Sequence, residues 1–207
     1  MSKVLILESS SRHQGATTRE LAGYFKGQWA QRFPQDAITE VDLFDDQVRF
    51  IDGDTIAANH SDGKDLSDKQ KAGVAYSDRY IQYLMDNDVW VIGAPMYNFS
   101  VPAVLKAFID QIVVPGKTFD YSTGVPKGLI SGKRVIVLTA SGGNYDNPPM
   151  SAMDFVEPYL RAVLGFLGVS DVTFVKVQGN HPEQIEAGKI AAKQAIDKLI
   201  VGEKVGV

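Results

Sequence analysis

The sequence contains no cysteine. This absence excludes disulfide bonds, cysteine-ligated zinc, iron–sulfur clusters and thiol redox chemistry, so any redox reaction would need a bound cofactor. An excess of positive charge is also missing, because 21 Lys and Arg residues stand against 25 Asp and Glu residues. The formal net charge of −4 disfavours non-specific binding to a phosphate backbone, and we expect no nucleic-acid partner.

Long apolar runs are missing as well. The run at 4–7 is far too short for a signal peptide or a membrane span, and no later run could cross a bilayer. We therefore expect a cytoplasmic protein without a membrane partner.

The three histidines, His13, His60 and His181, lack metal-ligand spacing, and the aspartates at 45–46 and 52–54 do not match a calcium loop, so no metal site is expected.

What the chain does contain is an alternation of buried strands and amphipathic helices, repeated five times. Strands are expected at 4–7, 38–43, 88–94, 134–140 and 172–177, and helices at 17–29, 67–85, 102–112, 153–167 and 182–200. Capping boxes are expected at 17–20 and 67–70. The 207 residues suit one domain over 1–207. Such an alternation predicts an α/β fold with a five-stranded parallel sheet, in the order 2-1-3-4-5, and helices on both faces.

Two segments interrupt the alternation. The polar stretch 44–65 is too long for a simple connection, and two interpretations stay open: a cover over a partner's ligand site, or a solvated excursion. The segment 115–132 is interpreted as a turn-rich insertion that helps to build a pocket. Trp29 and Trp90 are expected to fill the core.

Ligands of doubly wound sheets bind beyond the carboxyl ends of the strands, here after the first, third and fourth strands. The first of these loops, 9–18, is rich in hydroxyls and leads directly into a helix N-terminus, which offers N–H donors to an anion. It lacks the Gly-Lys-Ser/Thr ending of a Walker A loop and the Gly-x-Gly-x-x-Gly spacing of a dinucleotide-binding loop. A ligand with a terminal monophosphate is therefore favoured. An ordinary strand-to-helix loop with a threonine cap stays open as the alternative.

The other two loops offer a surface for a planar ring. In the loop 94–102, Met96, Tyr97, Asn98 and Phe99 lie between two prolines, and we favour ring binding over a hydrophobic plug. In the loop 139–145, Gly142 and Gly143 permit close backbone approach, although a plain turn is the alternative. Three suitable loops in the three expected places are more specific evidence for a ligand site than any one loop alone.

The segments 3–10, 94–99, 117–121 and 164–168 resemble the FMN-dependent NADH azoreductase family, whose members also reduce quinones. The resemblance covers essentially the whole chain. It implies a flavodoxin-like three-layer sandwich and a homodimer with two FMN sites at its interface. It further implies that NADH, with NADPH as the alternative, reduces quinones and aromatic azo compounds by ping-pong hydride transfer through flavin N5.

By position, the resemblance also implies residue roles. The cofactor-binding residues would be Ser10, Ala16, Thr17, Thr18, Pro95, Met96, Tyr97, Asn98, Phe99, Ala140, Ser141, Gly142 and Gly143. The substrate pocket would be formed by Asn98, Phe119, Tyr121, Tyr145 and Phe166. No catalytic side chain is expected, because the reacting atom belongs to the flavin.

The third loop departs from the family pattern. Ala140 and Ser141 stand where Ser-Arg is frequent, and Tyr145 stands where His is frequent. These changes leave the substrate range open, and Tyr145 would be a poor acid near neutral pH. The absence of a basic pocket for a 2′-phosphate favours NADH. The alternative function is a flavodoxin-type electron carrier or an FMN-binding redox sensor, but a carrier would be shorter and more acidic and would not need the segment 115–132.

Overall fold

The computed structural model describes residues 1–61, 63–122 and 124–202. Its strands are β1 (Lys3–Glu8), β2 (Ala37–Asp42), β3 (Val89–Pro95), β4 (Phe119–Asp120), β5 (Lys127–Gly128), β6 (Arg134–Ser141) and β7 (Asp171–Gln178). Its helices are α1 (Thr17–Arg32), α2 (Gly53–Asn59), α3 (Asp68–Asp86), α4 (Ala103–Ile112), α5 (Glu157–Leu167) and α6 (Pro182–Val201), with a 3-10 turn, η1, at Met150–Met153.

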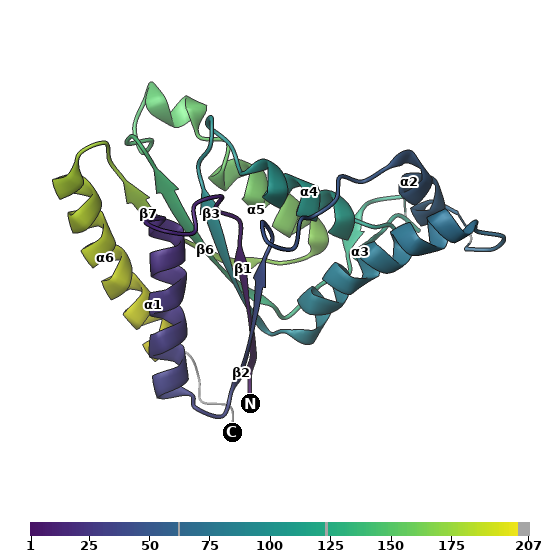
Figure 1. The fold of residues 1–207 in the computed structure, drawn as a ribbon, viewed down its shortest axis with the longest axis horizontal. Helices are drawn as coiled ribbons and strands as arrows, with labels where there is room; N and C mark the ends of the chain where they lie inside the picture. The colour runs from purple at the N-terminus through teal and green to yellow at the C-terminus, as the bar shows by residue number, and fades with distance from the viewer. Residues whose placement is uncertain (62, 123, 203–207) are drawn as a thin grey trace.

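The five long strands form a parallel sheet in the order β2-β1-β3-β6-β7, which confirms the predicted order and fold class. Helices α1 and α6 cover one face, and α3, α4 and α5 cover the other, while α2 and one end of α3 project beyond the sheet (Figure 1). Glu8 pairs with Gly93, and Pro95 pairs with Ala140. Strands β1, β3 and β6 therefore end at one edge, where their loops meet.

The apolar pattern of each strand follows from its place in the sheet. Every residue of the central strand β3 is buried, because helices pack on both of its faces. Trp90 lies in the core on the α3–α4–α5 side, and Trp29 lies in the core on the α1–α6 side. Both indoles are at most 2% exposed, which confirms their predicted place.

Helix starts were predicted with mixed success. Ser67 and Gln70 form the expected capping box of α3, and His181 and Pro182 begin α6 as expected. The capping box predicted for α1 is wrong, because the helix begins at Thr17 behind Ala16, and no side chain in the described ranges caps it. The expectation that Pro102 lies in the first turn of α4 is wrong by one residue, since Pro102 is the N-cap.

The segments predicted as loops hold additional structure. The stretch 44–65 contains α2, which Asp52 caps by accepting the Thr55 N–H at 2.8 Å. A Cβ added at Gly73 would lie 2.2 Å from Thr55 Oγ1, so α2 packs on α3 where that glycine leaves room. The segment 115–132 contains the antiparallel pair β4–β5.

The helix predicted from residue 153 begins later, at Glu157, because Met150–Met153 forms the 3-10 turn instead.

The length and polarity of the helices also decide whether any of them could cross a membrane. Within the described ranges, none of the helices combines the length and apolar character that crossing a bilayer requires.

Candidate functional site

A cavity of about 210 Å³ opens at the edge of the sheet where β1, β3 and β6 end. All three predicted loops line it. From the predicted cofactor set it brings together Ser10, Ala16, Thr17, Thr18, Pro95, Met96, Tyr97, Ala140, Ser141 and Gly142. Four further residues line the cavity without having been predicted: Arg12 in the first loop, Val177 in β7, Gly179 between β7 and α6, and Ile185 near the start of α6.

One end of the cavity is suited to an anion. The first N–H groups of α1 have no partner within the helix, and no described side chain caps them. Thr18, in the first turn, is fully buried, and its Oγ1 has no hydrogen-bond partner in the described part of the chain. A buried hydroxyl without a partner costs about 1–3 kcal/mol, so a ligand oxygen at this position would remove that cost. These donors fit the phosphate of FMN.

Arg12 adds a positive charge to the same end. Its side chain lines the cavity, and Nη2 donates to the Gly15 carbonyl at 2.9 Å. Gly15 has a positive φ of 67°, which glycine adopts without strain and which turns its carbonyl toward Arg12. A cation within a hydroxyl-rich loop was the sequence signal that could have identified this residue.

Tyr97 joins the first loop to the second. Its hydroxyl lies 3.3 Å from Ser10 Oγ and 3.1 Å from Ser11 Oγ, and it accepts the Ser11 N–H at 3.3 Å. Burial alone would raise the pKa of the Tyr97 phenol, but the hydrogen bonds from Ser10 and Ser11 and the charge of Arg12 outweigh it and lower the pKa. The phenol oxygen accepts the Ser11 N–H and is held by both serine hydroxyls at the cavity wall.

Asn98 and Phe99 form a tight turn after Tyr97. Their φ values are 48° and 72°, and the backbones of Tyr97 and Ser100 exchange hydrogen bonds of 2.9 and 3.1 Å across the turn. A left-handed conformation at two successive side-chain-bearing residues is strained. The turn places Asn98 in a second, open pocket of about 510 Å³, which shares Tyr97 with the first cavity and also contacts Lys106 and Tyr159.

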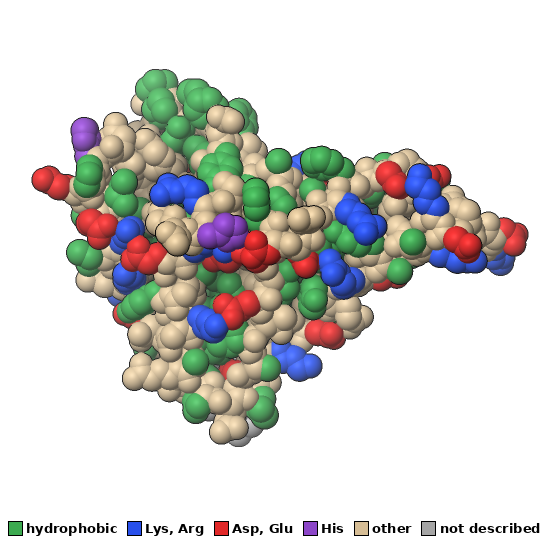
Figure 2. Space-filling model, viewed as in Figure 1, with side chains coloured by type: hydrophobic (Ala, Val, Ile, Leu, Met, Phe, Trp, Pro, Cys, Tyr) green, Lys and Arg blue, Asp and Glu red, His purple; other side chains and the backbone are tan. Residues whose placement is uncertain are grey.

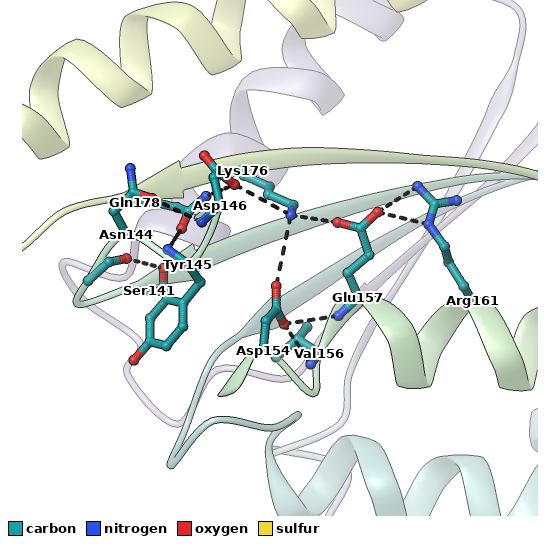
Figure 3. A network of polar contacts seen from close by, with 11 residues as sticks. Ser141, Asn144, Tyr145, Asp146, Asp154, Val156, Glu157, Arg161, Lys176 and Gln178 are labelled. Carbon is teal, nitrogen blue, oxygen red and sulfur yellow. Dashed lines mark hydrogen bonds and ion pairs between the residues drawn. The ribbon is translucent and has the colours of Figure 1, made fainter. Parts of the chain in front are cut away.

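The third loop is fastened to β7 by Gln178 (Figure 3). The Gln178 Oε1 accepts the Tyr145 N–H at 2.5 Å, and Nε2 donates to Asp146 Oδ1 at 2.7 Å. Within the loop, Ser141 Oγ donates to the Gly143 carbonyl at 2.8 Å. These bonds fix the path of the chain beside the cavity.

Behind the loop lies a cluster of charges centred on Lys176 (Figure 3). The Lys176 Nζ lies 2.5 Å from Glu157 Oε2 and 3.8 Å from both Asp146 Oδ1 and Asp154 Oδ2. Burial alone would raise the pKa of Glu157, but Lys176 and Arg161 outweigh it and lower the pKa. Glu157 therefore stays ionised near neutral pH, and its ion pair with Lys176 ties β7 to the start of α5.

The predicted substrate residues fall into two aromatic groups. Phe119 packs against Tyr121 and Phe166, with ring centroids 5.2 and 4.7 Å apart. Tyr145 packs edge-on against Phe99, with centroids 6.4 Å apart. The first group lies on the β4–β5 segment and α5, and the second lies at the tips of the second and third loops.

One group of potential metal ligands is found among the described residues. His13, Asp42 and Asp45 bring their ligand atoms within 4.8 Å of one another. Asp42 already binds the Arg19 guanidinium and accepts the Phe44 N–H at 3.0 Å. Because this carboxylate has other partners, we assign no ion to the group.

Comparison with known proteins gives consistent matches. A family model described as the flavodoxin-like fold matches residues 2–200. The chain is 42% identical over 179 residues to the FMN-dependent NADH:quinone oxidoreductase of Azotobacter vinelandii, covering 86% of this chain and 88% of that protein. It is 39% identical over 199 residues to the protein of the same name from Hydrogenovibrio crunogenus, covering 96% and 98%.

Solved structures agree with these relatives. An azoreductase from Bacillus anthracis superimposes with a TM-score of 0.90 at 30% identity, covering 97% of this chain and 99% of that chain. An FMN-dependent NADH-azoreductase from the same species, solved in complex with FMN, superimposes with a TM-score of 0.84 at 25% identity, covering 96% and 99%.

Proposed function

Because the chain belongs to the flavodoxin-like family and to the FMN-dependent NADH:quinone oxidoreductases within it, we propose that it uses NADH to reduce quinones and aromatic azo compounds. One observation carries the cofactor assignment. The buried Thr18 hydroxyl has no partner in the described part of the chain, and it lies at the uncapped start of α1, in a cavity that three loops form. This arrangement suits a ligand with a terminal phosphate and a planar ring.

The residues of the chain divide between the two ends of this ligand. Ser10, Thr17, Thr18 and the backbone N–H of Ala16 would hold the phosphate, together with Arg12. Pro95, Met96, Tyr97 and the turn 140–143 would border the ring, with Asn98 and Phe99 at its outer edge. Bound FMN would supply the redox chemistry by accepting hydride at N5 from NADH and, after NAD⁺ has left, delivering it to the acceptor.

The same cavity serves both substrates in this proposal, which gives ping-pong kinetics. In each turnover with a quinone, NADH, a proton and the quinone are converted to NAD⁺ and a hydroquinone. We place the acceptor against Asn98 and Tyr145, with Phe119, Tyr121 and Phe166 as further walls of the pocket. Tyr145 would pack on an aromatic acceptor, and its phenol would offer it a hydrogen bond.

We also propose a homodimer with the active sites at its interface. Hydrophobic side chains gather at the top of the molecule, over the segment between β6 and α5 (Figure 2). Phe155 is 55% exposed there, and Met150, Met153 and Phe99 are between 36% and 39% exposed. An apolar surface of this kind beside a ligand cavity suits a protein interface. The proposal further includes a single domain over 1–207 and a cytoplasmic location, where NADH is available.

The test is a turnover assay. The protein is purified with added FMN, and oxidation of NADH and of NADPH is followed with menadione, with methyl red and with neither acceptor. We expect acceptor-dependent oxidation, faster with NADH. Flavin that stays bound without acceptor-dependent turnover would favour an electron carrier or a sensor, and failure to bind flavin would remove the site assignment.

A further inference from the structure

Arg19 contacts the first loop, 9–18, but does not line the cavity. It is in the first turn of α1, and its Nη2 donates to the Ser10 carbonyl at 2.7 Å. Its Nη1 binds the carboxylate of Asp42, the last residue of β2. One guanidinium therefore connects three segments: the loop after β1, the start of α1 and the end of β2.

This connection is more constrained than a surface ion pair. The Arg19 side chain is 18% exposed and that of Asp42 is 21% exposed. Asp42 is itself fixed by the backbone, since its Oδ1 accepts the N–H groups of Phe44 at 3.0 Å and Asp45 at 3.4 Å. The planar guanidinium of arginine can bind a carboxylate and a carbonyl at the same time in fixed directions. The ammonium group of lysine binds the same two acceptors with less directional control.

The Ser10 carbonyl is the point at which Arg19 acts on the site. Ser10 is 1% exposed, and its Oγ accepts the Arg12 N–H at 3.2 Å and lies 3.3 Å from the Tyr97 hydroxyl. Fixing the carbonyl of this residue fixes the peptide that follows it, and with it the orientation of the loop toward Thr18. Ser10, Arg12 and Tyr97 all line the phosphate end of the cavity, so Arg19 acts on this end through the Ser10 peptide without contacting the cavity itself.

A half-buried carboxylate lies next to Arg19. Glu8 ends β1, and a Cβ added at Gly93 would lie 2.5 Å from its Oε2, which places this side chain against β3. Its Oε2 is buried without a hydrogen-bond partner in the described ranges. The charged groups that act on Glu8 are Arg19 from α1 and Asp42 and Glu40 from β2. Removing the Arg19 charge alone would leave Glu8 and Asp42 without their common cation. Such a variant could lose stability for a reason unrelated to the flavin.

We propose that Arg19 is a positioning residue for the phosphate of the bound flavin. It holds the Ser10 peptide so that the hydroxyls of the loop and the N–H groups of α1 face the cavity. The inference rests on the proposed function, because it presupposes FMN in this cavity. It predicts that Arg19 contributes to the binding of a flavin with a phosphate and not to the binding of a flavin without one.

The experiment compares FMN with riboflavin, which lacks the phosphate. The apoprotein is titrated with each flavin, and the quenching of flavin fluorescence gives Kd. Arg19→Lys keeps the charge beside Glu8 and Asp42, and the double variant Arg19→Met with Asp42→Asn removes both members of the ion pair. Lys26→Met is the matched control, because Lys26 lies on the same helix and binds Glu40 at the exposed surface.

We expect the Kd of FMN to rise about tenfold or more in the double variant and by a smaller factor in Arg19→Lys, as the loss of one charge-assisted hydrogen bond predicts. The Kd of riboflavin should change less than about threefold, and Lys26→Met should match the wild type in both titrations. An equal loss for both flavins, or an unchanged Kd of FMN in both Arg19 variants, would overturn the inference. A wild-type protein that binds neither flavin would instead refute the proposed function, and the inference with it.

Discussion

The Tyr97 hydroxyl lies 3.1 Å from Ser11 Oγ and 3.3 Å from Ser10 Oγ, so a single phenol joins the loops that follow β1 and β3. Tyr97→Phe removes these bonds and keeps the ring. We expect the affinity for FMN to fall by about 1–2 kcal/mol, a roughly 5- to 30-fold rise in Kd, because the two loops lose their common acceptor.

The control for this variant is Tyr24→Phe. The Tyr24 phenol donates to Asp197 between α1 and α6, at 2.9 Å, and does not line the cavity. Fluorescence titration should give the Tyr24 variant the Kd of the wild type. If both variants weaken FMN binding to the same extent, the bridge between the loops has no specific role.

Thr18→Val should have opposite effects on the apoprotein and on the complex. The substitution keeps the shape of the side chain and removes a buried hydroxyl that has no partner in the described ranges. Thermal unfolding of the apoprotein should therefore show unchanged or higher stability. The affinity for FMN should fall by about 1–3 kcal/mol, because the phosphate loses a donor. A destabilised apoprotein with unchanged affinity would show that the hydroxyl serves the fold and not the ligand.

The sequence predicted the architecture well because strong local patterns determine it. The fully apolar run of β3 could only be a strand buried on both faces, and it defined the centre of the sheet. Helix α2 was missed because its docking depends on Thr55 meeting Gly73, a contact between distant parts of the chain that leaves no periodic pattern. The short β4–β5 pair has two residues in each strand, too few to show alternation.

The site was predicted at the level of loops and less well at the level of single atoms. Because α1 begins at Thr17, the threonine that is buried is Thr18. Sequence patterns locate the first residue of a helix only to within one or two positions, so they do not identify which threonine is buried. Arg19 and Glu8 were not singled out, because their role depends on the end of β2, which only the folded sheet brings near. The positive φ of Phe99 likewise has no sequence signal, and that of Asn98 has only the weak one that asparagine adopts left-handed turns more readily than other side-chain-bearing residues.

Glu8 should make the stability of the apoprotein depend on pH. Burial raises its pKa from 4.5 to about 7, although the charge of Arg19 opposes this. The folded state thus binds the proton more tightly than the unfolded state, so the contribution of Glu8 to stability is largest at low pH and is lost as pH rises from about 4.5 to about 7. Relative to Glu8→Gln, the free energy of unfolding of the wild type should fall by about 3 kcal/mol across this range.

Urea unfolding of both proteins at pH values from about 5 to about 8 measures this difference. Glu183→Gln, which removes an exposed carboxylate in the first turn of α6, is the matched control. A difference between wild type and Glu8→Gln that stays constant, or that grows in favour of the wild type with rising pH, would contradict the prediction.

Phe155→Asp tests the proposed dimer. Phe155 is 55% exposed, and its N–H donates to the Phe99 carbonyl at 2.9 Å, so it connects the apolar surface to the turn beside the cavity. A carboxylate in a buried interface costs several kcal/mol, and light scattering should show a shift from dimer to monomer with reduced quinone turnover. Ile190→Asp, at a position 60% exposed on α6, should remain dimeric and active. A wild-type protein that is monomeric at micromolar concentration would refute the dimer.

Gln178→Leu should separate turnover from cofactor binding. The Gln178 amide accepts the Tyr145 N–H at 2.5 Å and donates to Asp146 at 2.7 Å, so both bonds to the third loop are lost together. We expect kcat/KM for menadione to fall about tenfold, because Tyr145 is no longer held beside the cavity. A fall of this size corresponds to the loss of one or two hydrogen bonds. The Kd of FMN should change less than about threefold, because the phosphate end is untouched.

Two further variants make this result specific. Gln178→Glu keeps an acceptor for Tyr145 but sets a second carboxylate against Asp146, so its kcat/KM should lie between those of the leucine variant and the wild type. Gln82→Leu removes a similar amide bond, to Asp86 on the exposed side of α3, and should leave both constants unchanged. If Gln178→Leu instead lost FMN and turnover in parallel, Gln178 would act through the part of the loop that borders the flavin ring, and the assignment of Tyr145 to the acceptor would have no support.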